Sequence, residues 1–309
     1  MRYVCVGVVL AALTGLELPA GAQQPLPTFK ASVDIVPISA VVRDRRGRIV
    51  TTLTAADFEV LDKGERRSIL DFQTDQDSPL TLAVLVDTSG SMRIGPKLAF
   101  ARDVLKRLAA DLQDGRDEVS LFTFDAALHE QQPFTLHPAA LSGALDGADP
   151  FGVTSLYDAI AETARRLADR PAQRRAVVVI TDGLDTSSAL TAEEVSGLAS
   201  SIDAPVYVVA TVPPIDYVLQ TDRATAVARF SVDLRDLATW TGGELLWVTT
   251  PEDAGQVREI VSELRHQYLI SIEPAAEQEW RPIDVRVRDR RMTVRARSGY
   301  FGTRAGASR

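Results

Sequence analysis

Short apolar runs alternate with amphipathic stretches through the middle of the chain. Leu80–Val86 and Ala176–Thr181 are almost continuous apolar runs, and Val119–Phe124 and Pro205–Thr211 have a similar length. Runs of this length, bounded by turn-forming residues, are typical of strands buried on both faces of a parallel sheet. The pattern therefore predicts a mostly parallel sheet between residues 80 and 265.

Amphipathic helices are predicted between these runs. In Pro96–Leu112, apolar residues recur every three or four positions, which places them on one helical face. The other helical stretches are Ser155–Leu167, Ala192–Ser201, Leu234–Thr239 and Glu252–Leu264. Because strands that alternate with helices form a sheet covered on both faces, we expect an α/β domain of Rossmann-like architecture.

The segments on both sides of this region are β-rich. The expected strands are Val33–Arg43, Asp57–Leu61 and Arg67–Phe72 before it, and Tyr268–Ile272, Ile283–Val287 and Met292–Ala296 after it. Neither flank has enough strands for a stable domain of its own. We therefore expect the two flanks to pair into one β-sandwich, with the α/β domain inserted between them.

Residues 1–22 have the composition of a secretory signal peptide. Arg2 gives a basic start, Val4–Leu13 is apolar but too short to span a bilayer, and Ala20–Ala22 resembles a cleavage site. Cleavage would remove Cys5, the only cysteine, and would leave a mature chain without a transmembrane helix. We expect a secreted, periplasmic or cell-envelope protein, since an exported chain without cysteine needs no disulfide chemistry.

Composition and net charge favour an ordinary globular protein that does not bind nucleic acid. The chain is 45% apolar and 25% charged, as in ordinary globular proteins, and its net charge is −8. A sequence pI near 5.1 argues against nucleic-acid binding.

Oxygen-bearing side chains follow two of the predicted strands. Asp87 ends the first apolar run and is followed by Ser89 and Ser91; Thr154 lies in a glycine-containing loop before a helix; Asp182 ends another apolar run. Ligands of open α/β sheets bind beyond the carboxyl ends of the strands. Two carboxylates and three hydroxyls are hard donors that suit Mg²⁺, with Mn²⁺ or Ca²⁺ as alternatives.

The order of these five residues resembles the metal-ion-dependent adhesion site of von Willebrand factor type A (VWA) domains. The resemblance implies that Ser89, Ser91 and Thr154 bind the cation directly or nearly so. It also implies that Asp87 and Asp182 bind directly or through water, and that a Glu or Asp of a protein ligand completes the shell. A site of this kind binds a partner, and nothing in it activates a nucleophile.

The resemblance covers residues 80–265. It divides the chain into the signal peptide, an N-terminal β-rich segment (23–79), the VWA domain (80–265) and a C-terminal β-rich segment (266–309). The β-rich flanks resemble those of a group of exported bacterial proteins with such a domain. We therefore expect a cation-dependent protein-binding module of adhesion or scaffold type, and not an enzyme.

Two alternatives stay open. In a metal-free structural scaffold of the cell envelope, the same Asp and Ser residues would only cap turns. In a phosphatase, Asp87 would be the nucleophile, but Ser89 stands where haloacid-dehalogenase phosphatases have a second Asp. The chain has no G-x-S-x-G, H-E-x-x-H or glycine-rich phosphate loop.

Three further carboxylates lie at the end of a predicted strand or close to Thr154 in sequence. Asp125 and Asp185 could orient the metal ligands, but a turn role is the preferred interpretation, whereas for Asp158 a ligand-orienting role and a capping role both stay open. The three histidines are scattered, and His129 and His137 are expected to be solvated.

Overall fold

The computed structural model describes residues 35–74, 77–171, 174–183, 185–211, 233–248, 250, 252–275, 277 and 279–301. These residues belong to one compact unit, and the signal-peptide prediction lies outside them. Within the described ranges, no helix combines the length and the apolar character needed to cross a membrane.

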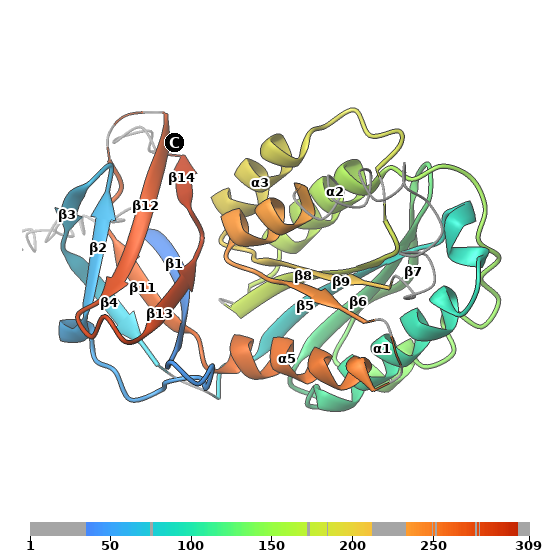
Figure 1. Cartoon of the computed structure of the whole chain (residues 1–309), viewed down its shortest axis with the longest axis horizontal. Helices are drawn as coiled ribbons and strands as arrows, with labels where there is room; N and C mark the ends of the chain where they lie inside the picture. Colours follow the sequence, from blue (N-terminus) through green and yellow to red (C-terminus); the bar gives the residue numbers. More distant parts are fainter. Residues whose placement is uncertain are drawn as a thin grey trace, which may run out of the picture. The chain divides into compact units, whose positions relative to one another are not determined.

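A six-stranded sheet forms the centre of the α/β part. Its strands are β5 (Leu80–Asp87), β6 (Glu118–Phe124), β7 (Leu128–Thr135), β8 (Arg174–Thr181), β9 (Val206–Ala210) and β10 (Leu245–Trp247). The strand order is β10-β9-β8-β5-β6-β7. Figure 1 labels β5 to β9 of this sheet. All neighbouring strands are parallel except β6 and β7. The predicted α/β class with a mostly parallel sheet is confirmed.

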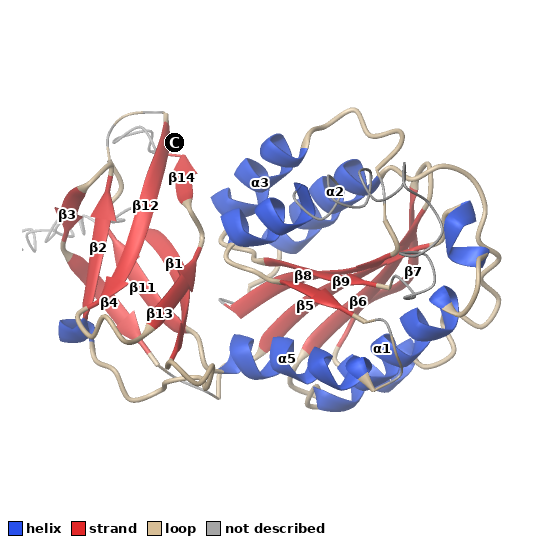
Figure 2. Cartoon of the chain, in the orientation of Figure 1, coloured by secondary structure: helices blue, strands red, loops and turns tan. Residues whose placement is uncertain are grey.

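Helices cover both faces of this sheet (Figure 2). One face carries α1 (Lys97–Asp111) and α5 (Arg258–Arg265), and the other carries α2 (Leu156–Ala168), α3 (Ala192–Ser201) and the helical residues 233–241. Short 3₁₀ turns are η2 (Gly90–Arg93), η3 (Pro138–Leu141) and η5 (Asp253–Val257).

Strand β5 separates the two hydrophobic layers. Successive side chains of a strand point to opposite faces. Leu82 and Val84 accordingly pack in the cluster that contains α1, whereas Ala83 and Leu85 pack in the cluster that contains α2. Every residue of β5 is buried, as the continuous apolar run predicts.

Three sequence-based expectations for this part need correction. Strand β7 was not expected, because its residues are mostly polar and partly exposed; it is an edge strand, where Pro133 is tolerated. The short parallel strand β10 was also not expected. The helix predicted over Glu252–Leu264 starts as the 3₁₀ turn η5, which contains Gly255, a poor helix former.

The β-rich flanks form two antiparallel four-stranded sheets. One has the strands β1 (Val36–Arg43), β4 (Ile69–Gln73), β11 (Tyr268–Ile272) and β13 (Thr293–Ala296). The other has β2 (Phe58–Asp62), β3 (Glu65–Arg67), β12 (Trp280–Val287) and β14 (Gly299–Phe301), and the turn η1 (Ala55–Asp57) precedes β2. Their orders are β13-β1-β11-β4 and β14-β12-β2-β3.

Each of these sheets contains strands from both flanks, and the two sheets share one hydrophobic cluster. Ile38 and Ile270 come from one sheet, and Val60 and Val285 come from the other. The flanks therefore pair with one another, as expected. Strand β14 was not expected, and the strand expected over Arg67–Phe72 is divided between β3 and β4.

Candidate metal centre

The candidate centre begins at the carboxyl ends of two adjacent strands. Strand β5 ends at Asp87, and its parallel neighbour β8 ends at Thr181, one residue before Asp182. After β5 the chain turns at once into η2, so that Ser89 and Ser91 stay close to the strand end. The topology thus brings together two chain segments that are far apart in sequence.

Asp87 is fully buried and both of its carboxylate oxygens accept hydrogen bonds. The backbone N–H of Ser89 donates to Oδ1 at 2.8 Å, and the Thr181 hydroxyl donates to Oδ2 at 2.6 Å. Burial, followed by the negative charge of Asp182, raises the pKa of Asp87 from 3.8 to about 6. The carboxyl is therefore held in a place that favours a compensating positive charge.

Ser89, Ser91 and Asp182 form a continuous row of oxygens. The two serine Oγ atoms are 3.1 Å apart, and the Ser91 hydroxyl donates to Asp182 Oδ1 at 2.8 Å. In an octahedral Mg²⁺ shell with bonds of 2.0–2.1 Å, neighbouring ligand oxygens are about 3 Å apart. The spacing and the chemistry of these donors therefore fit Mg²⁺.

Solvent exposure differs among the candidate ligands. Asp87 and Ser89 are buried, whereas Ser91 is exposed. A cation held here would thus be bound from the protein side and accessible to solvent near Ser91.

The loop that carries Thr154 lies against the loop after β5. The Gly90 N–H donates to the Gly152 carbonyl at 3.1 Å, and the Phe151 N–H donates to the Thr88 carbonyl at 2.9 Å. Gly152 has a φ of +86°, a conformation that favours glycine. Thr154 itself is buried at 5% exposure, and the place of its hydroxyl in a metal shell stays a prediction.

Lys97 was missed by the sequence analysis. It is the first residue of α1, and its ammonium forms a 2.8 Å ion pair with Asp182 Oδ2. Its Nζ also donates to the Ser91 carbonyl at 3.5 Å. Only 8% of the Lys97 side chain and 4% of the Asp182 side chain are exposed. A lysine in the first helical turn is usually solvated, so its sequence position gave no sign of this contact.

The three neighbouring carboxylates act in turns and helix starts. Asp125 accepts the Ala127 N–H at 3.0 Å, and Asp185 accepts the N–H of Leu156, the first residue of α2, at 2.8 Å. Asp158 accepts two backbone N–H groups of the loop before α3, at 2.9 and 3.0 Å. These contacts support the turn and capping interpretation of all three.

The described residues offer no cluster of acidic, histidine or cysteine side chains that would compete with this centre for a metal ion. Among the residues that the structure describes, no three or more Asp, Glu, His or Cys side chains are grouped so as to hold an ion. Most donors of the candidate centre are hydroxyls. His129 and His137 have exposed side chains, as expected.

Large apolar side chains are exposed on the same loops as the candidate ligands. Ile94 follows η2 and is 55% exposed, while Phe151 and Val153 flank Gly152 and are 76% and 48% exposed. Exposed apolar groups next to a polar site are typical of surfaces that contact another protein.

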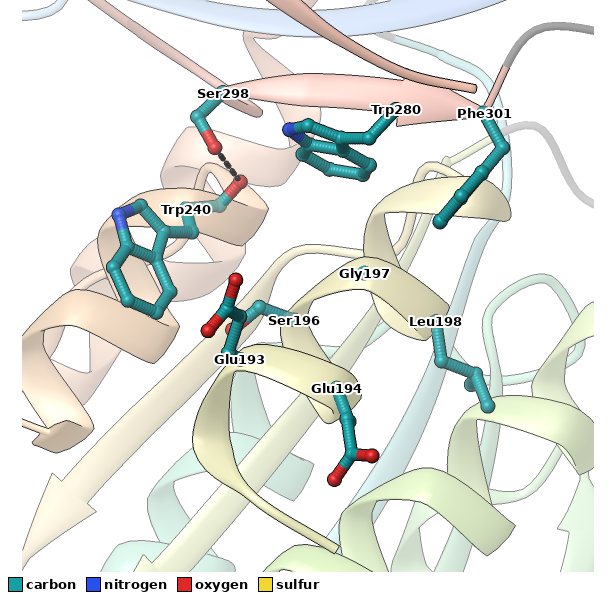
Figure 3. A pocket seen from close by; sticks show the side chains of 9 residues that line it. All are labelled: Glu193, Glu194, Ser196, Gly197, Leu198, Trp240, Trp280, Ser298 and Phe301. Carbon is teal, nitrogen blue, oxygen red and sulfur yellow. Dashed lines mark hydrogen bonds between the residues drawn. The ribbon is translucent and has the colours of Figure 1, made fainter. Parts of the chain in front are cut away.

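A separate groove of about 690 Å³ lies elsewhere, beside α3 (Figure 3). Trp280 and Phe301 pack edge to face there, with ring centroids 5.4 Å apart, and Trp240 lines another side. Glu194 is engaged at the start of α3, where it accepts the Thr191 N–H at 2.8 Å. The groove offers apolar surface, and the oxygen donors considered above lie outside its lining.

Comparison with known proteins bears on this α/β part. Residues 82–184 match the family model of the von Willebrand factor type A domain. The matched segment is similar in sequence to VWA domains. The match includes Asp87 and Asp182, and the resemblance inferred from the sequence is confirmed at the level of the domain family.

Solved structures are similar in fold. A von Willebrand factor type A protein from Catenulispora acidiphila has a TM-score of 0.50 and 13% identity, over 90% of this chain and 76% of that one. BatB from Bacteroides thetaiotaomicron has a TM-score of 0.48 and 18% identity, over 60% of this chain and 98% of that one. An aerotolerance-related membrane protein from Bacteroides fragilis has a TM-score of 0.47 and 21% identity, over 60% of this chain and 98% of that one. No curated protein matches this chain.

Proposed function

We propose that the VWA domain of this chain is a divalent-cation-dependent protein-binding module. Asp87, Ser89, Ser91, Thr154 and Asp182 would hold the ion, with Mg²⁺ as the expected cation and Mn²⁺ or Ca²⁺ as alternatives. The ion, when bound, supplies a coordination position for a Glu or Asp carboxylate of a protein ligand.

The observation that carries the proposal is the row of oxygens beside exposed apolar side chains. The separations of 3.1 and 2.8 Å suit neighbouring ligands of one small cation. Ile94 and Phe151 provide apolar contact area on the same loops. Together they suit a partner that brings a carboxylate and apolar side chains to the same place.

The phosphatase alternative is disfavoured by the surroundings of Asp87. A nucleophilic carboxylate needs an oxygen that can reach the substrate phosphorus. Asp87 is fully buried, and its two oxygens accept hydrogen bonds from Ser89 and Thr181. The exposed member of the row is the Ser91 hydroxyl, and it donates to Asp182.

Calorimetric titration with Mg²⁺ and Mn²⁺ separates the proposal from a metal-free scaffold. We expect binding by the wild-type protein, and a loss of at least tenfold in affinity in Asp87→Ala and Ser91→Ala. Asp125→Asn is the matched control, because Asp125 also follows a sheet strand but accepts a turn N–H, and it should bind like wild type. Ser91 is exposed, so its substitution tests the site without opening the core.

Two results would contradict the proposal. Wild-type protein that binds neither ion, or binding unchanged in Asp87→Ala, would favour the scaffold. Hydrolysis of a generic phosphomonoester that is lost in Asp87→Ala would favour the enzyme. A pull-down from the envelope fraction of the source organism, with and without EDTA, tests the cation-dependent protein ligand and the envelope location.

A further inference from the structure

A buried lysine lies among the candidate metal ligands. The Lys97 ammonium contacts Asp182 Oδ2 at 2.8 Å, while Asp182 Oδ1 accepts the Ser91 hydroxyl. Both partners of the ion pair are almost fully buried, so the interaction is only weakly screened by solvent. A fixed positive charge thus lies within contact distance of a residue expected to bind or orient a cation.

The charges of Asp87, Asp182 and Lys97 can be summed. The two carboxylates of Asp87 and Asp182 contribute −2, and Lys97 contributes +1, so these three side chains sum to −1. A divalent cation brings this sum to +1. Without the lysine charge the sum would be zero. An excess positive charge at a partly dehydrated centre attracts an anionic ligand.

We propose that Lys97 sets the balance between cation affinity and carboxylate capture at this centre. This inference rests on the proposed cation-dependent function and extends it to the control of selectivity. Lys97 weakens the hold on the divalent cation by charge repulsion, and it leaves the loaded centre electropositive. The loaded centre therefore binds a partner's carboxylate more tightly than a neutral centre would.

The fold explains how the lysine charge is held in place. Lys97 begins α1, whose apolar face packs against the sheet through Ala101 and Val104. The backbone at residue 97 is therefore anchored to the same sheet whose strand β5 carries Asp87. Displacing the ammonium would require the helix start to shift or the buried side chain to change its rotamer.

The test uses the full-length protein and removes the charge at two positions of the same helix. Lys97→Met keeps most of the side-chain length without the charge. Lys106→Met is the matched control, because Lys106 lies on α1 but is exposed, about 13 Å further along the helix. Lys97→Arg retains the charge, and Lys97→Gln is a second neutral variant if the methionine variant folds poorly. Thermal melts in EDTA verify that each variant is folded.

Titration with Mn²⁺ alone is the first readout. A unit charge a few ångströms from a doubly charged ion changes affinity by roughly tenfold even when water screens it strongly. We expect Lys97→Met to bind Mn²⁺ roughly tenfold more tightly than wild type, and Lys106→Met and Lys97→Arg to stay within about twofold.

Titration in the presence of acetate, a model carboxylate, is the second readout. Acetate should raise the apparent Mn²⁺ affinity of wild type and Lys106→Met, compared with an inert anion at equal ionic strength. The increase in apparent Mn²⁺ affinity that acetate causes should be severalfold smaller for Lys97→Met than for wild type.

The outcomes distinguish the inference from the proposed function. If wild type binds Mn²⁺ and Lys97→Met binds it equally or more weakly, the lysine merely positions Asp182 and the inference is overturned. If acetate helps both proteins equally, the claim about carboxylate capture is overturned. If only Lys97→Met binds Mn²⁺, the lysine charge excludes the cation from the native centre, and both the proposed function and the claim about carboxylate capture are overturned. If no variant binds Mn²⁺, both fall.

Discussion

At the residue scale, the candidate centre is arranged by local hydrogen bonds. The Ser89 N–H donates to the Asp87 carboxylate two residues earlier, which is the geometry of an Asx turn. The same bond keeps the Ser89 side chain beside the strand end, where the Ser91 hydroxyl is 3.1 Å away. Asp87, Ser89 and Ser91 alternate with other residues in this loop, and the turn brings their side-chain oxygens close together.

The pKa of Asp87 leads to a prediction on stability. A carboxyl whose pKa is about 6 in the folded protein and 3.8 in the unfolded chain binds its proton more tightly when folded. Its stabilising contribution is therefore complete below about pH 4 and is lost as the pH rises through 6. Without divalent cations, we expect the free energy of unfolding to fall by roughly 3 kcal/mol over this range from this group.

Urea unfolding in EDTA at several pH values measures this contribution. Asp87→Asn has no titrating carboxyl, so the difference between the two proteins isolates the effect from that of other groups. Addition of Mg²⁺ should restore stability mainly above pH 6, because the ion competes with the proton. Parallel pH profiles for wild type and Asp87→Asn would show that the prediction is wrong.

At the element scale, helix α5 is tied to the β-sandwich by a buried carboxylate. Glu263 accepts a hydrogen bond from Arg43 of β1 at 2.6 Å and one from Tyr207 of β9 at 3.0 Å, and it also pairs with Arg295 of β13. Only 1% of its side chain is exposed. The Glu263 side chain thus links helix α5 to strand β9 of the central sheet and to strands β1 and β13 of one sandwich sheet.

We expect Glu263→Gln to lower the free energy of unfolding by about 3–5 kcal/mol. The substitution removes the buried counter-ion that Arg43 and Arg295 share and leaves each arginine only a more exposed partner, Glu259 or Glu244. Loss of a buried counter-ion costs far more than the loss of a surface pair. Glu259→Gln is the matched control: Glu259 also pairs with Arg43, at 3.1 Å, but its side chain is 56% exposed. Its effect should lie within about 1 kcal/mol. Urea unfolding measures both, and equal effects would contradict the prediction.

At the scale of the whole molecule, the chain leaves the β-sandwich after β4 and returns to it with β11. Strand β1 pairs with β11 and β13, β4 pairs with β11, and β2 pairs with β12. Among the described N-terminal strands, only β2 and β3 pair with each other. The N-terminal segment therefore depends on strands about 200 or more residues later for most of its sheet pairing.

This topology predicts how fragments behave. A fragment of residues 23–79 should show no cooperative thermal transition, because it lacks the partners of β1, β2 and β4. A fragment of residues 80–265 should fold, since it retains all six strands of the central sheet and the helices on both faces. Circular dichroism during heating tests both. A cooperative transition in the short fragment would contradict the composite sandwich.

Much of this fold follows from local patterns. Continuous apolar runs identify β5 and β8 because strands buried on both faces need apolar residues at every position. Strand β7 has no such run, because it lies at an edge and is largely exposed, and β14 has only three residues. The pairing of the two flanks could be anticipated only from their shortage of strands.

The sequence by itself determined the strand–helix alternation, the oxygen donors at the strand ends and the VWA resemblance, because these depend on periodicity and on residue type. Tertiary structure alone decided which donors meet, how deeply Asp87 is buried, and that Lys97 and Glu263 become buried counter-ions. The physical reason is that burial and ion pairing arise between segments distant in the chain. The sequence around Lys97 or Glu263 therefore does not show which charged residue of a distant segment will pair with it.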